Sequence, residues 1–364
     1  MEKYKYTKTF SITMPDGNKK RIYIRANTKK ELEAKYIEKK LAYEKGEITV
    51  NSNTLFSRWA KEWLETYKKP SVTDGTLSNI RHIVNKFFLP YLGNLRLSDI
   101  KTIHIQHCMN HLQGYSKSVI NKAYNYINSM LEKAVINNLI NRNPCIGIVK
   151  PQGYEKINRR SLTAEEEDLF MQAIKTHEKG LLFGIMLACG LRPSEARALT
   201  WQDIDLKTKT VSIRQTIEYG KTTTKAPKSK AGFRTIPLPN WYIEMFKQKA
   251  IPSIDKNEFI FFSFAKKPMP KQKLERAWHS LVRDMDIAAG AKLYRNEIIE
   301  HAIDTSITPY YLRHTYATKL AEKGIDMKTA QYLLGHSDIK MTAQIYTHVT
   351  SKMLDTAREK INII

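Results

Sequence analysis

The sequence predicts a multidomain protein that is mainly α-helical and contains small β-sheets. Its 364 residues exceed one ordinary domain, and 42% of them are apolar, enough for more than one core. The hydrophobic pattern changes along the chain, from strand-like alternation to helical spacing and then to a mixture of the two. We therefore expect a strand-and-helix module (1–50), a helical bundle (54–148), a linker (149–160), a mixed α+β domain (161–349) and a tail helix (350–364).

The first 50 residues are predicted to form a small basic sheet with one helix. Lys8–Met14 and Arg21–Arg25 alternate like strands, and Asp16-Gly17 between them favours a hairpin because glycine accepts a positive φ at little cost. A helix should begin near Thr28, whose hydroxyl caps it, with Glu31 completing a capping box. Thirteen Lys and Arg against seven Asp and Glu favour a DNA-binding module. The alternative is a solvated charged face.

Residues 54–148 are predicted to form a separate bundle of about four helices. Apolar residues recur at helical spacing from Thr54 to Asn143, and Pro144 ends the last helix because the residue before a proline resists the α region. Such stripes are typical of packing rather than of a binding site. Residues 150–160 contain a proline, a glycine and no periodicity, so they predict an exposed linker.

Residues 161–349 are predicted to form the mixed α+β domain. Thr163 and Glu166 make a capping box for its first helix. Two alternating segments, Val211–Arg214 and Phe233–Ile236, predict strands joined by a lysine-rich loop.

Composition favours a nucleic-acid partner. Sixty Lys and Arg against 36 Asp and Glu give a formal net charge of +24, so the chain repels itself unless a polyanion meets it. DNA or RNA fits better than an anionic membrane surface. No run approaches the roughly 20 apolar residues of a membrane span, and the first residues lack the apolar core of a signal peptide. We expect a cytoplasmic, nucleoid-associated protein that does not bind membranes.

The three cysteines, Cys108, Cys145 and Cys189, are too few and too scattered for a disulfide framework or a zinc site. Cys189 resembles a candidate nucleophile, but it closes an apolar run and is more typical of core packing. The sequence therefore predicts no metal and no cofactor.

Arg192 stands where it can reach a ligand. It follows Gly190, at which an apolar helix should end, and precedes a short helix that Ser194 should cap. An arginine suits an anion such as a phosphodiester because it is always charged and presents a fork of donors. We interpret Glu195 as a group that orients the cations of this candidate anion-binding site. The alternative is an acid favoured by the helix dipole.

Arg313 and His336, like Arg192, are predicted to lie where they can reach a ligand. Arg313 belongs to a predicted helix running from Thr308 to Ala321, beside its apolar stripe, where an arginine needs an anion or an acid. His336 follows a helix that should stop at Gly335, which leaves the imidazole at an element boundary. A simple histidine cap is the alternative.

Together these residues resemble the catalytic boxes of the tyrosine recombinases, the phage-integrase family. The matching segments are Cys189–Glu195, Leu312–Tyr316 and Leu334–Ser337. Tyr346 follows His336 by ten residues. The resemblance implies that Arg192 and Arg313 bind the scissile phosphate, that His336 donates to a phosphate oxygen and that Tyr346 is the nucleophile.

Lys230 matches the lysine that the family uses as general acid on the 5′-oxygen leaving group. An alkoxide leaves poorly unless it is protonated, so the role is chemically sound. Lys221, Lys225 and Lys228 lie in the same loop. Contact with the phosphate backbone remains open for all four.

The resemblance also implies an architecture and a reaction. The basic module corresponds to an arm-binding domain, the bundle to a SAM-like core-binding domain and the last domain to the catalytic domain. Tyr346 would form a 3′-phosphotyrosine bond and release a 5′-hydroxyl, without ATP or metal. Four protomers on double-stranded DNA, with core and arm sites, would exchange strands through a Holliday junction. The tail would pack on a neighbouring protomer or on its own domain.

Kinship further implies integration and excision of a phage or another mobile element. An excisionase and a host DNA-bending protein are possible partners on the same ground.

Tyr310 departs from the family pattern, since a histidine usually stands three residues before the second arginine. A phenol can donate to phosphate, but with an ordinary pKa near 10 it is a poor base at neutral pH. Deprotonation of Tyr346 would then be shared with the phosphate or water, and His301 and His314 are conceivable substitutes.

Three rival interpretations follow from the same residues. A chromosome-resolving recombinase and a type IB topoisomerase are also enzymes of this chemistry, although the N-terminal 50 residues argue against minimal resolvers. A DNA-binding regulator descended from an integrase is the non-enzymatic rival.

Overall fold

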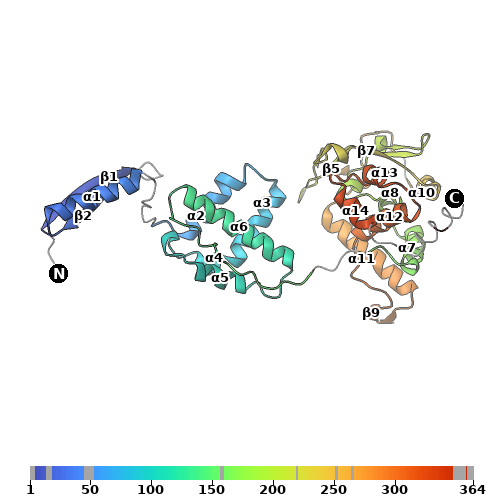
Figure 1. Cartoon of the computed structure of the whole chain (residues 1–364). Helices are drawn as coiled ribbons and strands as arrows, with labels where there is room; N and C mark the ends of the chain where they lie inside the picture. Colours follow the sequence, from blue (N-terminus) through green and yellow to red (C-terminus); the bar gives the residue numbers. More distant parts are fainter. Residues whose placement is uncertain are drawn as a thin grey trace. The chain divides into compact units, whose positions relative to one another are not determined.

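The structure is a computed structural model. It describes residues 5–13, 19–44, 53–155, 160–218, 220–250, 253–263, 266–346 and 358. The chain divides into two compact units, residues 1–157 and 158–364, which are described separately (Figure 1). Within the described ranges no helix is both long and apolar enough to cross a membrane.

The N-terminal module is an antiparallel hairpin with one helix. Its elements are β1 (Tyr6–Thr13), β2 (Lys19–Ala26) and α1 (Lys29–Glu44). Strand alternation puts Ile24 and Ala26 against Leu32 of the helix. The hydroxyl of Thr28 accepts from the N–H of Glu31 at 3.2 Å, which confirms the predicted cap. The Glu31 carboxylate reaches the N–H of Asn27. The predicted Asp16-Gly17 turn lies outside the described residues.

The bundle is built from the expected helical stripes. Its elements are α2 (Phe56–Trp63), η1 (Leu64–Lys68), α3 (Asp74–Phe87), α4 (Leu89–Leu92), η2 (Leu97–Asp99), α5 (Thr102–Asn110) and α6 (Lys117–Ile136). Their apolar faces meet in one core around Trp63 and Phe88. The prediction that the last helix reaches Asn143 is wrong. Helix α6 ends at Ile136 because Asn138 takes a left-handed φ of 55°.

The second unit begins with helices. They are α7 (Ala164–Thr176), α8 (Gly180–Cys189) and α9 (Pro193–Ala196), followed by the turn η3 (Trp201–Asp203). Thr163 and Glu166 form the predicted capping box of α7. Helix α8 is buried almost throughout because its residues are apolar on every side. It is the centre of this unit's core, and Cys189 is fully buried in it.

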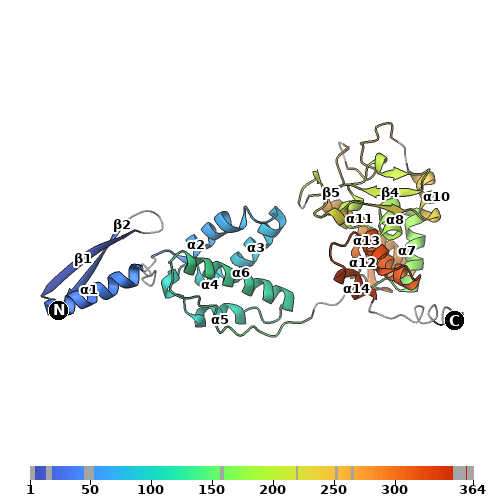
Figure 2. The same cartoon turned by 45° about the horizontal axis from the view of Figure 1, so that its top comes forward.

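Short strands and turns follow. They are β3 (Ile204–Asp205), β4 (Thr210–Ile213), β5 (Thr216–Ile217), β6 (Thr224–Lys225), η4 (Lys230–Gly232) and β7 (Arg234–Pro237). Strands β3, β4 and β7 form an antiparallel sheet in which Val211 pairs with Ile236, so the two strands predicted from the alternation are confirmed. Figure 2 shows this sheet along one side of the helices.

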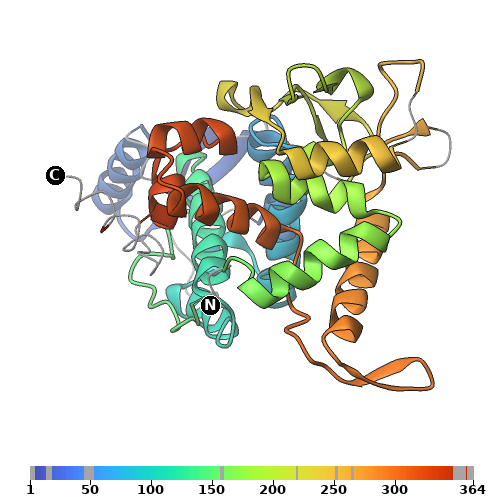
Figure 3. The same cartoon turned by 90° about the vertical axis from the view of Figure 1, so that its right-hand side faces the viewer.

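The remaining elements complete the unit. They are α10 (Asn240–Lys249), α11 (Lys271–Ala288), β8 (Lys292–Tyr294), β9 (Glu297–Glu300), α12 (Tyr310–Glu322), α13 (Met327–Leu334) and α14 (Lys340–Tyr346). The β8–β9 hairpin extends from the end of α11 (Figure 3). The predicted tail helix 350–364 lies outside the described residues except for Arg358.

Two glycines end the helices that matter for the site. Gly190 follows α8 with φ 60°, and Gly335 follows α13 with φ 64°. Both conformations disfavour other residues. Because α12 packs against both helices, the two helix ends and Arg313 of α12 lie close to one another.

Candidate active site

Arg192 is held by its own turn. Its backbone N–H donates to the Glu195 carboxylate at 2.9 Å, and its Nη1 donates to the same carboxylate at 2.7 Å. The N-cap of α9 is therefore Arg192 itself, with Pro193 in the first turn, and the prediction that Ser194 caps this helix is wrong. Glu195 is only 5% exposed. Its carboxylate accepts both hydrogen bonds from Arg192, and it is more deeply buried than the sequence alone predicts.

Arg313 lies in the interior beside the ends of two helices. It donates from Nη1 to the Gly190 carbonyl at 2.7 Å and from Nη2 to the Leu334 carbonyl at 2.5 Å. Burial, and next the positive charge of Arg192, lower the pKa of Arg313 to about 9, against the opposing effects of Glu195 and Tyr310. The guanidinium therefore stays charged at neutral pH.

His336 is buried next to these cations. Its Nδ1 lies 2.9 Å from the Thr342 hydroxyl. Burial, and next the positive charges of Arg313 and Arg192, lower the pKa of His336 to about 4. The imidazole is therefore neutral at physiological pH, and one of its nitrogens can still donate.

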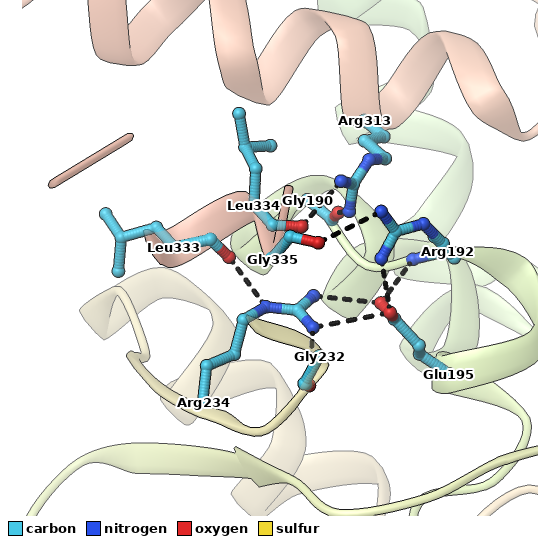
Figure 4. Close-up of polar contacts among 9 residues, drawn as sticks. All are labelled: Gly190, Arg192, Glu195, Gly232, Arg234, Arg313, Leu333, Leu334 and Gly335. Atoms are coloured by element: carbon cyan, nitrogen blue, oxygen red, sulfur yellow. Dashed lines mark hydrogen bonds and ion pairs between the residues drawn. The ribbon is translucent and has the colours of Figure 1, made fainter. Parts of the chain in front are cut away.

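Arg234 is a member of the site that the sequence interpretation missed. Its side chain is 0% exposed and forms an ion pair with Glu195 at 2.9 Å. It also donates from Nε to the Leu333 carbonyl at 2.8 Å and from Nη1 to the Gly232 carbonyl at 3.2 Å (Figure 4). A signal was available, since Arg234 shares the buried face of β7 with Ile236, and a charged residue on such a face needs a partner.

Three arginines thus contact three successive carbonyl groups at the end of α13. Arg234 binds the Leu333 carbonyl, Arg313 that of Leu334, and Arg192 that of Gly335 at 3.2 Å. The last carbonyls of a helix lack intrahelical donors and carry a partial negative charge. The helix end therefore offsets part of the repulsion among the guanidinium groups, so they can gather in one place.

Lys230 lies in the turn next to this cluster. Its side chain is exposed, and it begins η4, whose Gly232 carbonyl binds Arg234. A Cβ added to Gly335 would lie 2.9 Å from the Ala231 carbonyl oxygen, so the turn packs directly against the start of the His336 segment. Of the alternative lysines, Lys221 is paired with Glu218 at 3.0 Å.

Tyr346 ends α14, and its hydroxyl donates to the Ile325 carbonyl at 2.9 Å. Burial, and next the charge of Asp326, raise the pKa of this phenol above its ordinary value. The structure therefore brings Arg192, Glu195, Arg313 and His336 together, while the proposed nucleophile is held on the turn before α13.

Three further groups named in the sequence analysis are Tyr310, His301 and His314. Tyr310 is the first residue of α12 and is 37% exposed, one helical turn before Arg313. His301 lies at the end of the β8–β9 hairpin, where its Nδ1 is 2.6 Å from the buried carboxylate of Asp286. His314 is among the charges that act on His336. Within the described ranges, no group of three or more His, Cys, Asp and Glu is arranged to hold a metal ion.

Comparison with known proteins decides the family. The sequence profile described as "Phage integrase family" matches residues 160–353, and "Phage integrase, N-terminal SAM-like domain" matches residues 55–113. The chain belongs to the phage integrase family. This membership confirms the resemblance drawn from the catalytic boxes, together with the enzyme class and the function class, a tyrosine recombinase of the integrase type.

Relatives of this integrase-family chain cover most of its length. It is 30% identical over 362 residues to "Tyrosine recombinase XerC-like" of Caldanaerobacter subterraneus subsp. tengcongensis, covering 92% of this chain and 90% of that protein. It is 25% identical over 331 residues to "Transposase from transposon Tn916" of Enterococcus faecalis, covering 85% of this chain and 77% of the relative.

Solved structures of integrases share the fold, which confirms the predicted fold class. The Tn1549 transposon integrase bound to transposon right end DNA matches with a TM-score of 0.62 and 21% identity, covering 84% of this chain and 98% of that one. A lambda integrase tetramer bound to a Holliday junction matches with a TM-score of 0.58 and 18% identity, covering 91% and 89%.

Proposed function

We propose that this integrase-family protein is the site-specific recombinase of a phage or another mobile element. The observation that carries the proposal is the rigid set of cations around the end of α13, with Arg192 and Arg313 beside a neutral His336. The 25% identity to a protein named as a transposon transposase supports a mobile element.

The phosphate chemistry follows from charge. A pentavalent transition state concentrates negative charge on the two non-bridging oxygens, and prearranged donors aimed there lower the barrier. Arg192 is 30% exposed, so part of its fork faces outward. We assign Arg192 and Arg313 to the non-bridging oxygens. The Thr342 hydroxyl would donate to Nδ1 of His336, which leaves Nε2–H for the phosphate.

Cleavage then forms one bond and breaks another. The Tyr346 oxygen attacks phosphorus, giving a 3′-phosphotyrosine, while the bond to the 5′-oxygen breaks and that oxygen takes a proton from Lys230. The tyrosine proton leaves to the phosphate, water or a neighbouring group. The pKa of this phenol is raised where it lies. Its hydroxyl must therefore leave the Ile325 carbonyl and move to the cationic site before it reacts.

Cleavage is tested with nicked duplexes tiled across the DNA that flanks the gene of this protein. The wild type should give a detergent-stable 3′-linked adduct on one duplex. Tyr346→Phe should bind that duplex and give no adduct. Tyr294→Phe is the matched control, because Tyr294 is an exposed phenol of the same unit, and it should cleave normally. Tight binding by the wild type with no adduct would favour the DNA-binding regulator, and relaxation of plasmids without site preference would favour a topoisomerase.

The N-terminal module is proposed to bind the arm sites. The face of its hairpin turned away from α1 exposes Arg21, Tyr23 and Arg25 on β2, opposite Ser11, Thr9 and Thr7 of β1. Two-stranded ribbons fit the major groove, and arginines there read guanine or hold phosphate. Arg21→Gln combined with Arg25→Gln should weaken arm-site binding and lower the salt slope by up to about 0.9 per lost phosphate contact. Lys39→Gln, on the exposed surface of α1, should not.

Assembly is proposed as a tetramer on core and arm DNA. The lambda integrase structure, a tetramer on a Holliday junction, supports this. An excisionase and a host DNA-bending protein are proposed as further partners, and the tail as the contact between protomers. Removal of residues 350–364 should abolish synapsis and spare cleavage by the monomer. Loss of solubility would contradict the exchange of the tail between protomers.

A further inference from the structure

We infer that Arg234 is a positioning residue that keeps Arg192 available to the scissile phosphate and aligns the segments that carry Lys230 and His336. The inference rests on the proposed function, since it assigns a role in the same phosphate site. Arg234 itself is fully buried, so it acts through its neighbours rather than by touching DNA.

The carboxylate of Glu195 is shared between two arginines. Oε1 accepts from Nη1 of Arg192 at 2.7 Å and from Nη1 of Arg234 at 3.3 Å, while Oε2 accepts from the Arg192 backbone and from Nη2 of Arg234, both at 2.9 Å. Every strong acceptor position of this carboxylate is therefore occupied. Without Arg234, only the two hydrogen bonds from Arg192 would remain of these four, and the less neutralised carboxylate would draw the Arg192 guanidinium inward, away from the phosphate.

Loss of Arg234 would also lower the net positive charge of the cluster. Three guanidinium groups, of Arg192, Arg234 and Arg313, and one carboxylate, of Glu195, leave a net charge of 3 − 1 = +2. Loss of Arg234 would leave +1 facing a transition state that is more negative than the ground state.

The same guanidinium also joins three parts of the chain that are far apart in sequence. Its contacts reach Glu195 beside Arg192, Gly232 in the turn of Lys230 and Leu333 just before His336. All donor nitrogens of Arg234 are used in this way (Figure 4). A lysine presents its three donors from a single nitrogen, so it cannot reproduce contacts that here come from three separate nitrogens. The arrangement therefore requires arginine, and not merely a positive charge.

The experiment compares cleavage of a nicked duplex with cleavage of the same duplex carrying a methylphosphonate at the scissile position. The methylphosphonate lacks the negative charge that the arginines neutralise. On phosphate, Arg234→Gln should cleave about 100-fold more slowly at saturating DNA, because misplacement of a reacting group by about 1 Å costs that much. Its DNA Kd should stay within about threefold of wild type, since Arg234 does not reach DNA. On methylphosphonate its defect should shrink to about tenfold or less.

Two variants guard against a folding defect. Arg234→Lys keeps the charge and should lose less than Arg234→Gln on phosphate. The double variant Arg234→Gln with Glu195→Gln removes the buried acid as well, and should cleave faster than Arg234→Gln alone if an uncompensated carboxylate is the cause. Arg214→Gln is the matched control, because Arg214 pairs with the buried Asp203 at 2.6 Å in the same unit. It should cleave normally.

Equal losses of Arg234→Gln on the two substrates, or a double variant slower than the single one, would overturn the inference and leave Arg234 a purely structural residue. If the wild type forms an adduct and Arg234→Gln matches it, the inference fails alone. If the wild type forms no adduct on any duplex, the proposed function fails and the inference falls with it.

Discussion

Gly335→Ala is the sharpest test of how tightly the site is packed. Gly335 ends α13 with φ 64°, and a Cβ there would lie 2.8 Å from Nη1 of Arg234 and 2.9 Å from the Ala231 carbonyl oxygen. Neither neighbour can give way easily, since one is a buried guanidinium with four hydrogen bonds and the other is backbone. The methyl group must therefore displace Arg234 or the turn of Lys230.

Gly335→Ala costs free energy in two ways, through the left-handed backbone conformation and through the clash of the added methyl group, and Gly220→Ala tests the first alone. Gly220 has a similar φ of 71° but has nothing within 4 Å of an added Cβ. It should cost only the left-handed conformation, about 1 kcal/mol. Gly335→Ala adds displacement of a buried ion pair, for which full loss costs about 3–5 kcal/mol. Since the methyl group shifts the pair rather than removing it, we expect an excess of about 1–3 kcal/mol over Gly220→Ala.

Calorimetry of the full chain measures this excess. For a unit of this size 1 kcal/mol lowers Tm by about 2–4 °C, so Gly220→Ala should melt about 3 °C below wild type and Gly335→Ala about 6–12 °C below it. Cleavage by Gly335→Ala should fall at least about 10-fold, while Gly220→Ala should cleave normally. Equal melting temperatures with full cleavage by both variants would refute the close packing of Gly335 on Arg234.

Three further outcomes follow from burial and charge. Burial raises the pKa of Glu195, but Arg234, Arg192 and Arg313 together lower it to about 2. The stabilisation that the ionised carboxylate contributes is therefore present above pH 4.5 and lost as the pH falls towards 2. In urea titrations, Glu195→Gln should make the free energy of unfolding depend less on pH in this range. The folded-state pKa of His336, about 4, lies below its ordinary value, so stability should be lost as pH falls from about 6.5 to 4, and His336→Asn should remove that loss. Cys189 is fully buried with a raised pKa, and a maleimide should label it only after unfolding.

Local signals in the sequence were sufficient for much of the fold. The caps at Thr28 and Thr163 were predictable because capping depends on residues three positions apart. The strands that contain Val211 and Ile236 were predictable from alternation, whereas their register was not. Helix α6 was predicted too long because apolar spacing continues past Asn138, and periodicity carries no information about a single left-handed residue.

Arg192, Glu195, Arg313 and His336 can be named as candidates from the sequence, but their contacts and the presence of Arg234 cannot. Arg313 and Gly190 are 123 positions apart, and Arg234 and Leu333 are 99 apart. Such pairs depend on how α8, β7 and α13 pack, which no local pattern encodes. Residue type alone predicts Ser194 as the cap, whereas Glu195 satisfies the turn because its carboxylate is fixed by Arg234.

Helix α13 lies between the turn that holds Tyr346 and the arginine cluster. The turn before it provides the Ile325 carbonyl that holds Tyr346, and its last residues provide the carbonyls that hold the arginines. Met327 and Leu334, the first and last residues of α13, are seven positions apart, which at about 1.5 Å per residue corresponds to about 10 Å along the helix. The hydrogen bond from the Tyr346 hydroxyl to the Ile325 carbonyl contributes only about 1 kcal/mol. If Tyr346 is the nucleophile, as proposed, its release should therefore cost less free energy than displacement of the arginines, and we expect DNA at the arginine site to recruit Tyr346 without disturbing the cluster.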